Sequence, residues 1–226
     1  MVVFGQGPRM AQPPWRTTLV LLTPLLALCA CSSGTSHPTG ATSGPPARSL
    51  SAPPSVGATP APAQQSAVAV ESNPPGDIAD NLAYVPYSNA AGGYRFVHPE
   101  GWTQLDSGRA VTLTGKLSGV HAEPGPRTNP PTLDQGKADA AALASSEAAF
   151  ELRSVAATSL PGGTGVLIVY RRNSDPDPVT GRQYRDEVQR YEVVHAGHEV
   201  VLELFGPVGS DNVDAYRKIS QSLQIG

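Results

Sequence analysis

The chain has 226 residues, of which 23 are glycine and 23 are proline; 15% of its residues are charged, and its formal net charge is −3. This length and composition predict one globular domain together with a segment that does not fold. They exclude a general nucleic-acid binder, because phosphate contacts require clustered lysine and arginine and the sequence has only the pair Arg171 and Arg172.

An apolar run spans residues 19–28 and follows Arg9 and Arg16. It is shorter than the roughly 20 apolar residues of a membrane span, and its basic flank is typical of a signal peptide. We therefore predict that residues 1–30 are a signal peptide. Met10 is an alternative start to Met1, because residues 10–30 form a complete short signal that includes Arg16.

Residues 28–31 (LCAC) resemble the lipobox of bacterial lipoproteins, in which an aliphatic, a variable and a small residue precede the lipidated cysteine. The resemblance implies that Cys31 receives diacylglycerol and anchors the chain in the lipid bilayer at the outer face of the cell membrane. Cys29 fits less well, because Leu28 precedes it where a small residue is preferred. A disulfide between the two cysteines is the alternative, although cysteines two residues apart do not easily close a bridge. No cysteine follows Cys31, so we expect no disulfide in the exported domain.

Residues 31–81 are rich in Ser, Thr, Pro, Ala and Gly and contain almost no large apolar side chain. Such a segment cannot bury enough apolar surface to offset the entropy lost on ordering, so we predict a disordered tether between the lipid anchor and the domain. Arginine outnumbers lysine by 13 to 3, and Ala, Gly and Pro are abundant. This bias indicates GC-rich codons and therefore an actinobacterial source.

Residues 82–226 are predicted to form the globular domain, which needs no crosslink at this size. Alternating or continuous apolar runs predict strands over 94–98, 110–114, 119–123, 150–155 and 166–170. A helix capped by Thr132 is predicted to run through the alanine-rich residues 137–149, and a last helix follows Ser210 or Asp211. The apolar stripe of the last helix consists of Val213, Tyr216, Ile219, Ser220 and Leu223.

Two further strands, over 190–195 and 198–205, flank the turn residues Ala196 and Gly197 and predict a hairpin. With His195 opposite His198, the apolar residues of both strands face the core, and one opposite-charge pair meets on the other side. The predicted cross-strand pairs are Val193–Val200, Tyr191–Leu202 and Arg190–Glu203.

Four features of the domain carry a family resemblance: the pattern Tyr94-x-Phe96-x-x-Pro99-x-Gly101-Trp102, the buried strand that ends in Tyr170, the charged hairpin, and the closing helix with Tyr216 and Ile219. They resemble the PsbP-like family, known from the extrinsic oxygen-evolving-complex protein of photosystem II, a Ran-binding nuclear import factor and actinobacterial lipoproteins of the LpqN/LpqT type. The resemblance implies an α+β fold, an antiparallel β-sheet with helices packed on it in an α/β/α sandwich. It also implies docking onto larger assemblies rather than catalysis.

Catalytic motifs are absent from the sequence: it has no G-x-S-x-G elbow, P-loop or H-E-x-x-H. We predict no cofactor. The loop 174–181 begins like a calcium loop with Asp175 and Asp177, but Val179 stands at the third ligand position, which favours a proline-stiffened hairpin loop. His195 and His198 lie close enough across their turn to share a zinc or copper ion if a third ligand approaches; otherwise they are polar turn residues at the sheet edge.

Three functions remain after this search. The first is an anchored docking or accessory module that recruits an envelope protein, favoured by the tether and the missing catalytic motifs. The second is a carrier or receptor for a small hydrophobic ligand. The third is a wall hydrolase, for which Glu192, Glu203 and His195 are candidate residues. The aromatic residues that line either the core or a ligand cleft are Tyr94, Phe96, Trp102, Tyr170 and Tyr191.

Overall fold

The computed structural model describes residues 64–226. The predicted signal peptide, Cys31 and residues 32–63 of the predicted tether lie outside these residues. Within the described part of the chain, no helix is both long enough and apolar enough to cross a membrane.

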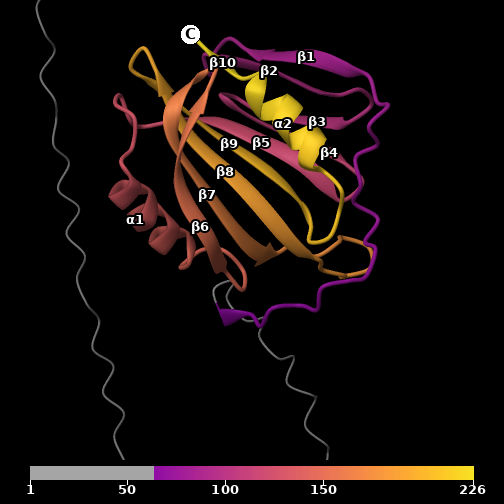
Figure 1. Ribbon diagram of the computed structural model, residues 1–226. Helices are drawn as coiled ribbons and strands as arrows, with labels where there is room; N and C mark the ends of the chain where they lie inside the picture. The colour runs from indigo at the N-terminus through magenta and orange to yellow at the C-terminus, as the bar shows by residue number, and fades with distance from the viewer. Residues whose placement is uncertain (1–63) are drawn as a thin grey trace, which may run out of the picture. The chain divides into compact units, whose positions relative to one another are not determined.

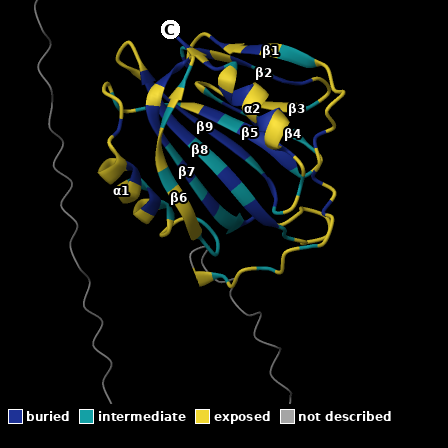
Figure 2. Cartoon of the chain, viewed as in Figure 1, coloured by how far each residue is buried: buried dark blue, intermediate teal, exposed yellow. Residues whose placement is uncertain are grey.

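Seven antiparallel strands form the main sheet in the order β3-β4-β5-β9-β8-β7-β6 (Figure 1). They are β3 (Thr103–Ser107), β4 (Ala110–Gly115), β5 (Ser118–Gly125), β6 (Glu151–Leu160), β7 (Gly163–Asn173), β8 (Arg185–His195) and β9 (His198–Pro207). Burial is greatest in the central strands, whereas the edge strands β3 and β6 are largely exposed (Figure 2). Successive residues of a strand point to opposite faces, so the central strands supply buried residues to both faces of the sheet.

One face of the main sheet is covered by a small sheet and a helix. The small sheet has the order β1-β2-β10, with β1 (Tyr84–Asn89), β2 (Tyr94–Pro99) and β10 (Gln224–Ile225), and the helix is α2 (Val213–Gln221). Together they enclose the larger hydrophobic core. Its most deeply buried members include Phe96, Val120, Leu202, Leu204, Ile219 and Leu223.

The opposite face carries the helix α1 (Leu133–Leu143), which packs on β6 and β7 and covers only that end of the sheet (Figure 1). A second core forms there between Ala140 of α1 and Val166, Ile168 and Tyr170 of β7. Thr132 caps α1 as predicted, and it shares a capping box with Gln135. The predicted fold class, an α+β fold with helices packed on an antiparallel sheet, is confirmed.

The helix α1 ends at Leu143, six residues before the predicted end. Phe150 stacks on Tyr170 with 5.2 Å between the ring centroids, and Glu147 pairs with Arg172 at 2.9 Å. These contacts require the chain to turn back toward the sheet, and Ala149 reaches this turn with a φ of 51°. Tertiary contacts therefore outweigh the helix propensity of the alanine-rich sequence.

The helix α2 begins after Asn212 and not after Ser210 or Asp211. The Asn212 side chain makes no cap, because its amide binds Gly76 and Ile78 instead. Val213 is 67% exposed, so it does not belong to the buried stripe, whereas Tyr216 and Ile219 do.

The β8–β9 hairpin has the predicted register. His195 lies opposite His198, and the pairs Val193–Val200, Tyr191–Leu202 and Arg190–Glu203 all form. The two turn residues Ala196 and Gly197 both have positive φ, at 48° and 81°, as a two-residue hairpin turn requires.

Residues 64–81, here called the N-terminal strap, contact the domain although sequence analysis assigns them to the tether. Asn173 accepts a hydrogen bond from the Val68 amide at 3.0 Å and donates one to the Ser66 carbonyl at 2.8 Å. Ser118 donates to the Gly76 carbonyl at 2.5 Å, and Ile78 is buried in the larger core. The packed part of the chain thus begins before the predicted boundary at residue 82.

Candidate functional site

The five aromatic residues predicted to line the core or a cleft lie in the core or at its edge. Tyr94, Phe96 and Tyr191 belong to the larger core, Tyr170 belongs to the second core, and Trp102 is partly buried against the larger one. The Tyr94 hydroxyl donates to the Ala122 carbonyl at 2.8 Å, which satisfies its buried polar atom. These residues therefore pack in the interior of the fold, and Tyr94 also borders a cavity of about 290 Å³ beside β10.

The histidine pair of the hairpin turn lies at one end of the sheet. His195 and His198 oppose each other and are both exposed. Within residues 64–226 no group of three or more His, Cys, Asp or Glu side chains is arranged to hold a metal ion. The third ligand that the pair would need is thus not supplied by the described part of the chain.

The candidate hydrolase residues Glu192 and Glu203 are both bound by one arginine. The Arg190 guanidinium donates to Glu192 Oε1 at 2.7 Å and to Glu203 Oε1 at 2.6 Å. Burial opposes ionisation of Glu203, but Arg190 and Arg172 outweigh it and lower the pKa of that carboxyl. For Glu192, burial outweighs Arg190 and raises the pKa. His195 lies at the end of β8 and takes no part in this cluster.

A second arginine extends the buried charge network toward α1. Arg127 lies in the segment between β5 and α1. Its guanidinium group donates to Glu199 Oε1 at 2.9 Å and to Glu192 Oε2 at 3.2 Å. It also donates to both carboxylate oxygens of Asp139, at 2.7 and 2.8 Å. Gly125 makes this possible, because a Cβ there would lie only 2.2 Å from a Glu199 carboxylate oxygen. The network attaches α1 to the sheet, and the carboxylates of Glu192 and Glu199 are both paired with arginine within it.

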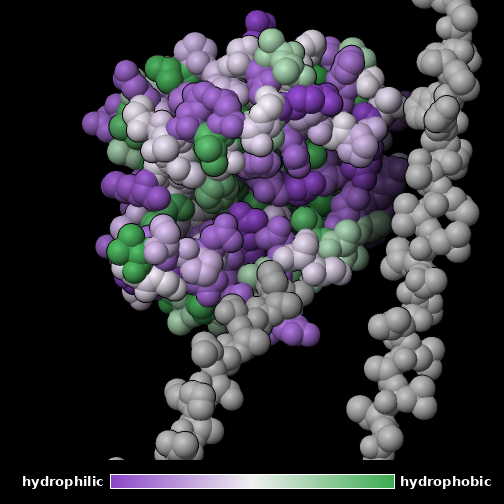
Figure 3. Space-filling model, turned by 180° about the vertical axis from the view of Figure 1, so that it is seen from behind, coloured by the Kyte–Doolittle hydropathy of each residue, from purple (hydrophilic) through white to green (hydrophobic). Residues whose placement is uncertain are grey.

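A cavity lies on this same face of the sheet, beyond the area that α1 covers. It has a volume of about 570 Å³ and is bounded by β4, β5, β7, β8, β9 and the loop 174–184. Seen from behind, this side of the molecule is hollowed and predominantly hydrophilic (Figure 3). The polar and aromatic residues of its lining include Thr112, Thr114, Lys116, His121, Arg172, Asp175, Asp177, Arg182, Asp186, Glu203 and Phe205.

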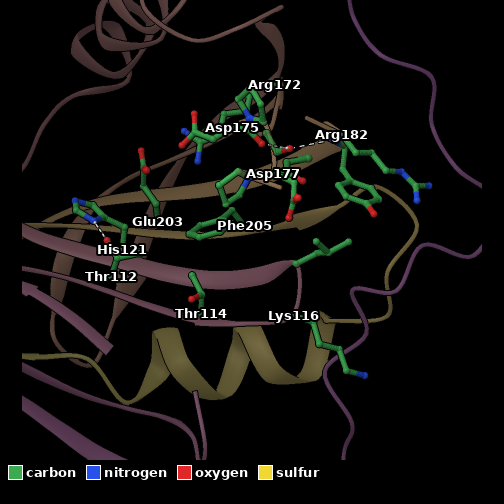
Figure 4. A pocket seen from close by; sticks show the side chains of 16 residues that line it. Thr112, Thr114, Lys116, His121, Arg172, Asp175, Asp177, Arg182, Glu203 and Phe205 are labelled. Carbon is green, nitrogen blue, oxygen red and sulfur yellow. Dashed lines mark hydrogen bonds between the residues drawn. The ribbon is translucent and has the colours of Figure 1, made fainter. Parts of the chain in front are cut away.

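The floor of the cavity comes from side chains of neighbouring strands. Thr112 of β4 and His121 of β5 are joined by a hydrogen bond of 2.9 Å, and Glu203 of β9 is the cross-strand partner of His121 (Figure 4). Phe205 follows on β9, with the Arg172 guanidinium over its ring at 5.7 Å from the centroid. Gly119 opposite leaves room for this ring, since a Cβ there would lie 2.5 Å from the Phe205 Cζ.

Asp186 is the cavity residue with the most unusual environment. The residue as a whole is only 3% exposed, its carboxylate borders the cavity, and it makes no hydrogen bond or ion pair with any residue in 64–226; the fully buried side-chain atom without a partner in this range is Ser210 Oγ. Burial raises the pKa of this carboxyl to about 7; Asp175 adds to the increase, and Arg172 and Arg185 oppose it. A buried carboxylate without a partner lowers the stability of the fold. Such a group is therefore a candidate for a binding site, where a ligand can supply the missing partner.

Sequence analysis did not identify Asp186 as a site residue. The strand predicted from sequence begins at Arg190, whereas β8 begins at Arg185. Asp186 therefore lies outside the predicted strand. The signal was available in the alternation of Asp186, Val188, Arg190 and Glu192, which places three charged residues on one face of a central strand. The sequence predicts a proline-stiffened hairpin loop over 174–181, and Asp177 accepts hydrogen bonds from the Val179 and Thr180 amides of its own turn.

Comparisons with known proteins identify no family. No protein-family model and no curated protein matches the chain. Among solved structures, cyanobacterial PsbP (CyanoP) from Synechocystis sp. PCC 6803 matches with a TM-score of 0.45 and 16% identity, over 68% of this chain and all of that one. The Ran-binding protein Mog1p of Saccharomyces cerevisiae matches with a TM-score of 0.43 and 6% identity, over 64% of this chain and 96% of that one.

The cyanobacterial structure is of the PsbP type that the sequence resemblance names. At these TM-scores and identities, the similarity assigns neither a site residue nor an activity to this chain.

Proposed function

We propose that this chain is a membrane-anchored, non-catalytic binding module of the bacterial cell envelope, held at the outer face of the cell membrane by the acylated Cys31. The binding site of the module is the cavity between the sheet and the loop 174–184. Two lipid chains or more give stable anchoring where a single chain is marginal, so the expected lipidation suffices as the anchor.

One observation carries the binding part of this proposal. The carboxylate of Asp186 is buried and has no partner among the described residues, and it borders a cavity of about 570 Å³. That volume falls in the range of about 300–1,000 Å³ typical of small-molecule sites. A bound ligand would supply the hydrogen bonds that this carboxylate lacks.

The buried charge network supports a non-catalytic role. A glycosidase needs two carboxyl groups that are free to act on a substrate. Glu192, Glu199 and Glu203 are instead held by Arg190 or Arg127 in the interior of the fold. They stabilise the attachment of α1 and the hairpin.

Of the three functions considered from sequence, the cavity best supports a carrier or receptor for a small ligand. The expected chemistry of the ligand changes. Most lining residues carry a charge or a hydroxyl group, although apolar atoms supply the larger share of the lining surface, so the expected ligand has a polar group joined to an apolar part. An envelope protein partner stays a prediction, and the experiment below distinguishes the two.

The test is photo-crosslinking in cells with the full-length chain. A benzoylphenylalanine at Val179, which is 91% exposed on the loop beside the cavity, should capture a small-molecule adduct that mass spectrometry of the purified membrane fraction detects. The control position is Val213, which is 67% exposed on α2, the helix that covers the other face of the sheet. Benzoylphenylalanine at Val213 should capture no small-molecule adduct.

The Cys31→Ala variant should move the chain out of the membrane fraction, and retention there would contradict the anchor. Equal adducts at Val179 and Val213 would contradict the cavity as the binding site. A protein adduct at Val179 alone would replace small-ligand binding by docking of an envelope partner at the same place.

A further inference from the structure

We propose that the cavity binds a small organic ammonium ion, whose N–H groups donate hydrogen bonds to the carboxylate of Asp186, with Asp175 as a second acceptor at the rim. This inference rests on the proposed binding function and names the chemical class of its ligand.

The charge balance of the cavity favours a cation once the internal partners are assigned. Among the basic residues of the lining, Arg172 pairs with Glu147 at 2.9 Å and Arg182 pairs with Glu71 of the N-terminal strap. The remaining ammonium group, that of Lys116, lies at the rim, and its side chain extends away from Phe205 (Figure 4).

The acidic residues are not neutralised to the same degree. Glu203 is bound by Arg190 at 2.6 Å and accepts from the Tyr170 hydroxyl at 3.3 Å, and Asp177 is used by its own turn. Asp175 and Asp186 have no ion pair or side-chain hydrogen bond within residues 64–226. Two carboxylates thus remain for a ligand, one of them buried, and a buried carboxylate is best satisfied by a charged donor.

The position of Asp186 orients it toward the cavity and not toward the larger core. On β8 it lies two and four residues from Val188 and Arg190, on the face that carries the second core and the charge network. Its cross-strand neighbour Arg172 turns its guanidinium toward Glu147 and Phe205 and forms no ion pair with it. The carboxylate is therefore free to accept from a molecule in the cavity.

The remaining lining suits the organic part of such a ligand. Phe205 of β9 offers an aromatic ring, and the hydroxyl groups of Thr112 and Thr114 lie on β4, which β5 separates from β9 (Figure 4). A volume of about 570 Å³ accommodates a ligand of aromatic-amine size with several water molecules. The probe chosen is accordingly 2-phenylethylammonium, with 2-phenylethanol as its uncharged analogue and 3-phenylpropanoate as its anionic analogue.

The affinity should depend on pH in a defined direction. The charged groups near Asp186 are Arg172 on β7, Asp175 in the loop and the adjacent residue Arg185. The charge of Asp186 also contributes to the raised pKa of the Tyr216 hydroxyl on α2. With burial they bring the pKa of the Asp186 carboxyl to about 7, so the ionised form that accepts an ammonium ion increases as the pH rises through 7. An alkylammonium group stays charged to well above pH 8. Binding should therefore be about tenfold tighter at pH 8 than at pH 6.

The experiment is a calorimetric and NMR titration of the full chain in detergent with each of the three probes. The ammonium probe should bind and shift the signals of the cavity residues, and the alcohol and the anion should bind at least tenfold more weakly. Asp186→Asn, which keeps the shape and removes the charge, should weaken the ammonium probe by at least tenfold. Glu100→Gln, which removes one exposed carboxylate at the turn after β2, should leave the affinity unchanged.

Two results would overturn the inference, and they have different consequences. If the alcohol or the anion binds as tightly as the ammonium ion, or if Asp186→Asn binds it equally well, the ligand class is wrong but the cavity is still a binding site. If none of the probes shifts the cavity residues, the ammonium assignment fails and the cavity loses its support as the binding site. Should Asp186→Asn fail to fold, the pH dependence of the unaltered chain decides, and an affinity that does not change between pH 6 and pH 8 refutes the role of Asp186.

Discussion

At the scale of single residues, the most consequential feature is a set of charges buried between the sheet and α1. Arg190 neutralises two carboxylates at once, Glu192 with 1% of its side chain exposed and Glu203 with 10%. Burying ions is costly, and a partly broken network is worse than an apolar core. The stability of this domain should therefore depend strongly on one guanidinium group.

Replacing Arg190 by Met should lower the free energy of unfolding at pH 7.5 by about 3–5 kcal/mol, because it removes the closest ion pair of two buried carboxylates: Glu203 keeps only the Tyr170 hydroxyl and Glu192 only Arg127 at 3.2 Å. Their folded-state pKa values would then exceed the unfolded values, so this penalty is present at neutral pH and is lost as the pH falls and they become protonated. Urea unfolding at pH 7.5 and pH 5 measures both effects.

The control is Arg171→Met, in a partly exposed pair with Glu187, which should cost about 1 kcal/mol or less. Equal losses for the two variants, or a loss at Arg190 that is the same at pH 5, would show that the buried network is not what holds this face together.

At the scale of elements, α1 depends more on its ends than on its composition. It has a narrow buried contact, formed by Gly136 and Ala140, and its alanine-rich C-terminal continuation is not helical. The capping box between Thr132 and Gln135 is thus a substantial part of what fixes the start of the helix. This end matters for the site because Asp139 of α1 anchors Arg127.

Thr132→Ala should cost about 1 kcal/mol in the free energy of unfolding, since the N-terminal amides of α1 lose their acceptor. Gln135→Ala removes the other bond of the box, from the Thr132 amide to Gln135 Oε1, and should cost less; the double variant should cost less than the sum of the two, because either bond helps to hold the helix start in the geometry that the other requires. Strictly additive losses in a chemical-denaturation double-mutant cycle would show that the box does not act as a unit.

At the scale of the whole molecule, the N-terminal strap links the two sides of the sheet. It reaches the loop of the cavity through Asn173 and Arg182, and it reaches α2 and the larger core through Asn212 and Ile78. The chain that leads to the proposed lipid anchor is therefore attached to the wall of the proposed binding site.

Ile78→Ala should lower the free energy of unfolding by about 2–4 kcal/mol, because this side chain is 5% exposed and leaves a cavity in the larger core. Val70→Ala, in the same strap but 51% exposed, should change it by about 0.5 kcal/mol or less. Thermal and denaturant unfolding measure the difference. An Ile78 variant as stable as the Val70 variant would mean that the strap does not form part of the domain.

Features that depend on short-range rules could be predicted without the fold. The two-residue turn at Ala196 and Gly197, together with the alternation of apolar residues, set the register of the β8–β9 hairpin, and one charge pair confirmed it. Thr132 was recognisable as a cap because the capping bond spans three residues. The α+β class followed from the order of such elements.

Which polar groups find partners depends on contacts between distant parts of the chain. The Asn212 side chain does not cap α2 because Gly76 and Ile78, more than 130 residues away in the sequence, occupy its amide. Arg127 joins Glu192 and Glu199 across more than 60 residues. Asp186 has no ion pair, because the neighbouring Arg172 and Arg185 pair with Glu147 and Glu151 instead. Pairings over such separations depend on how the strands are ordered in the sheet, and local periodicity carries no information about that order.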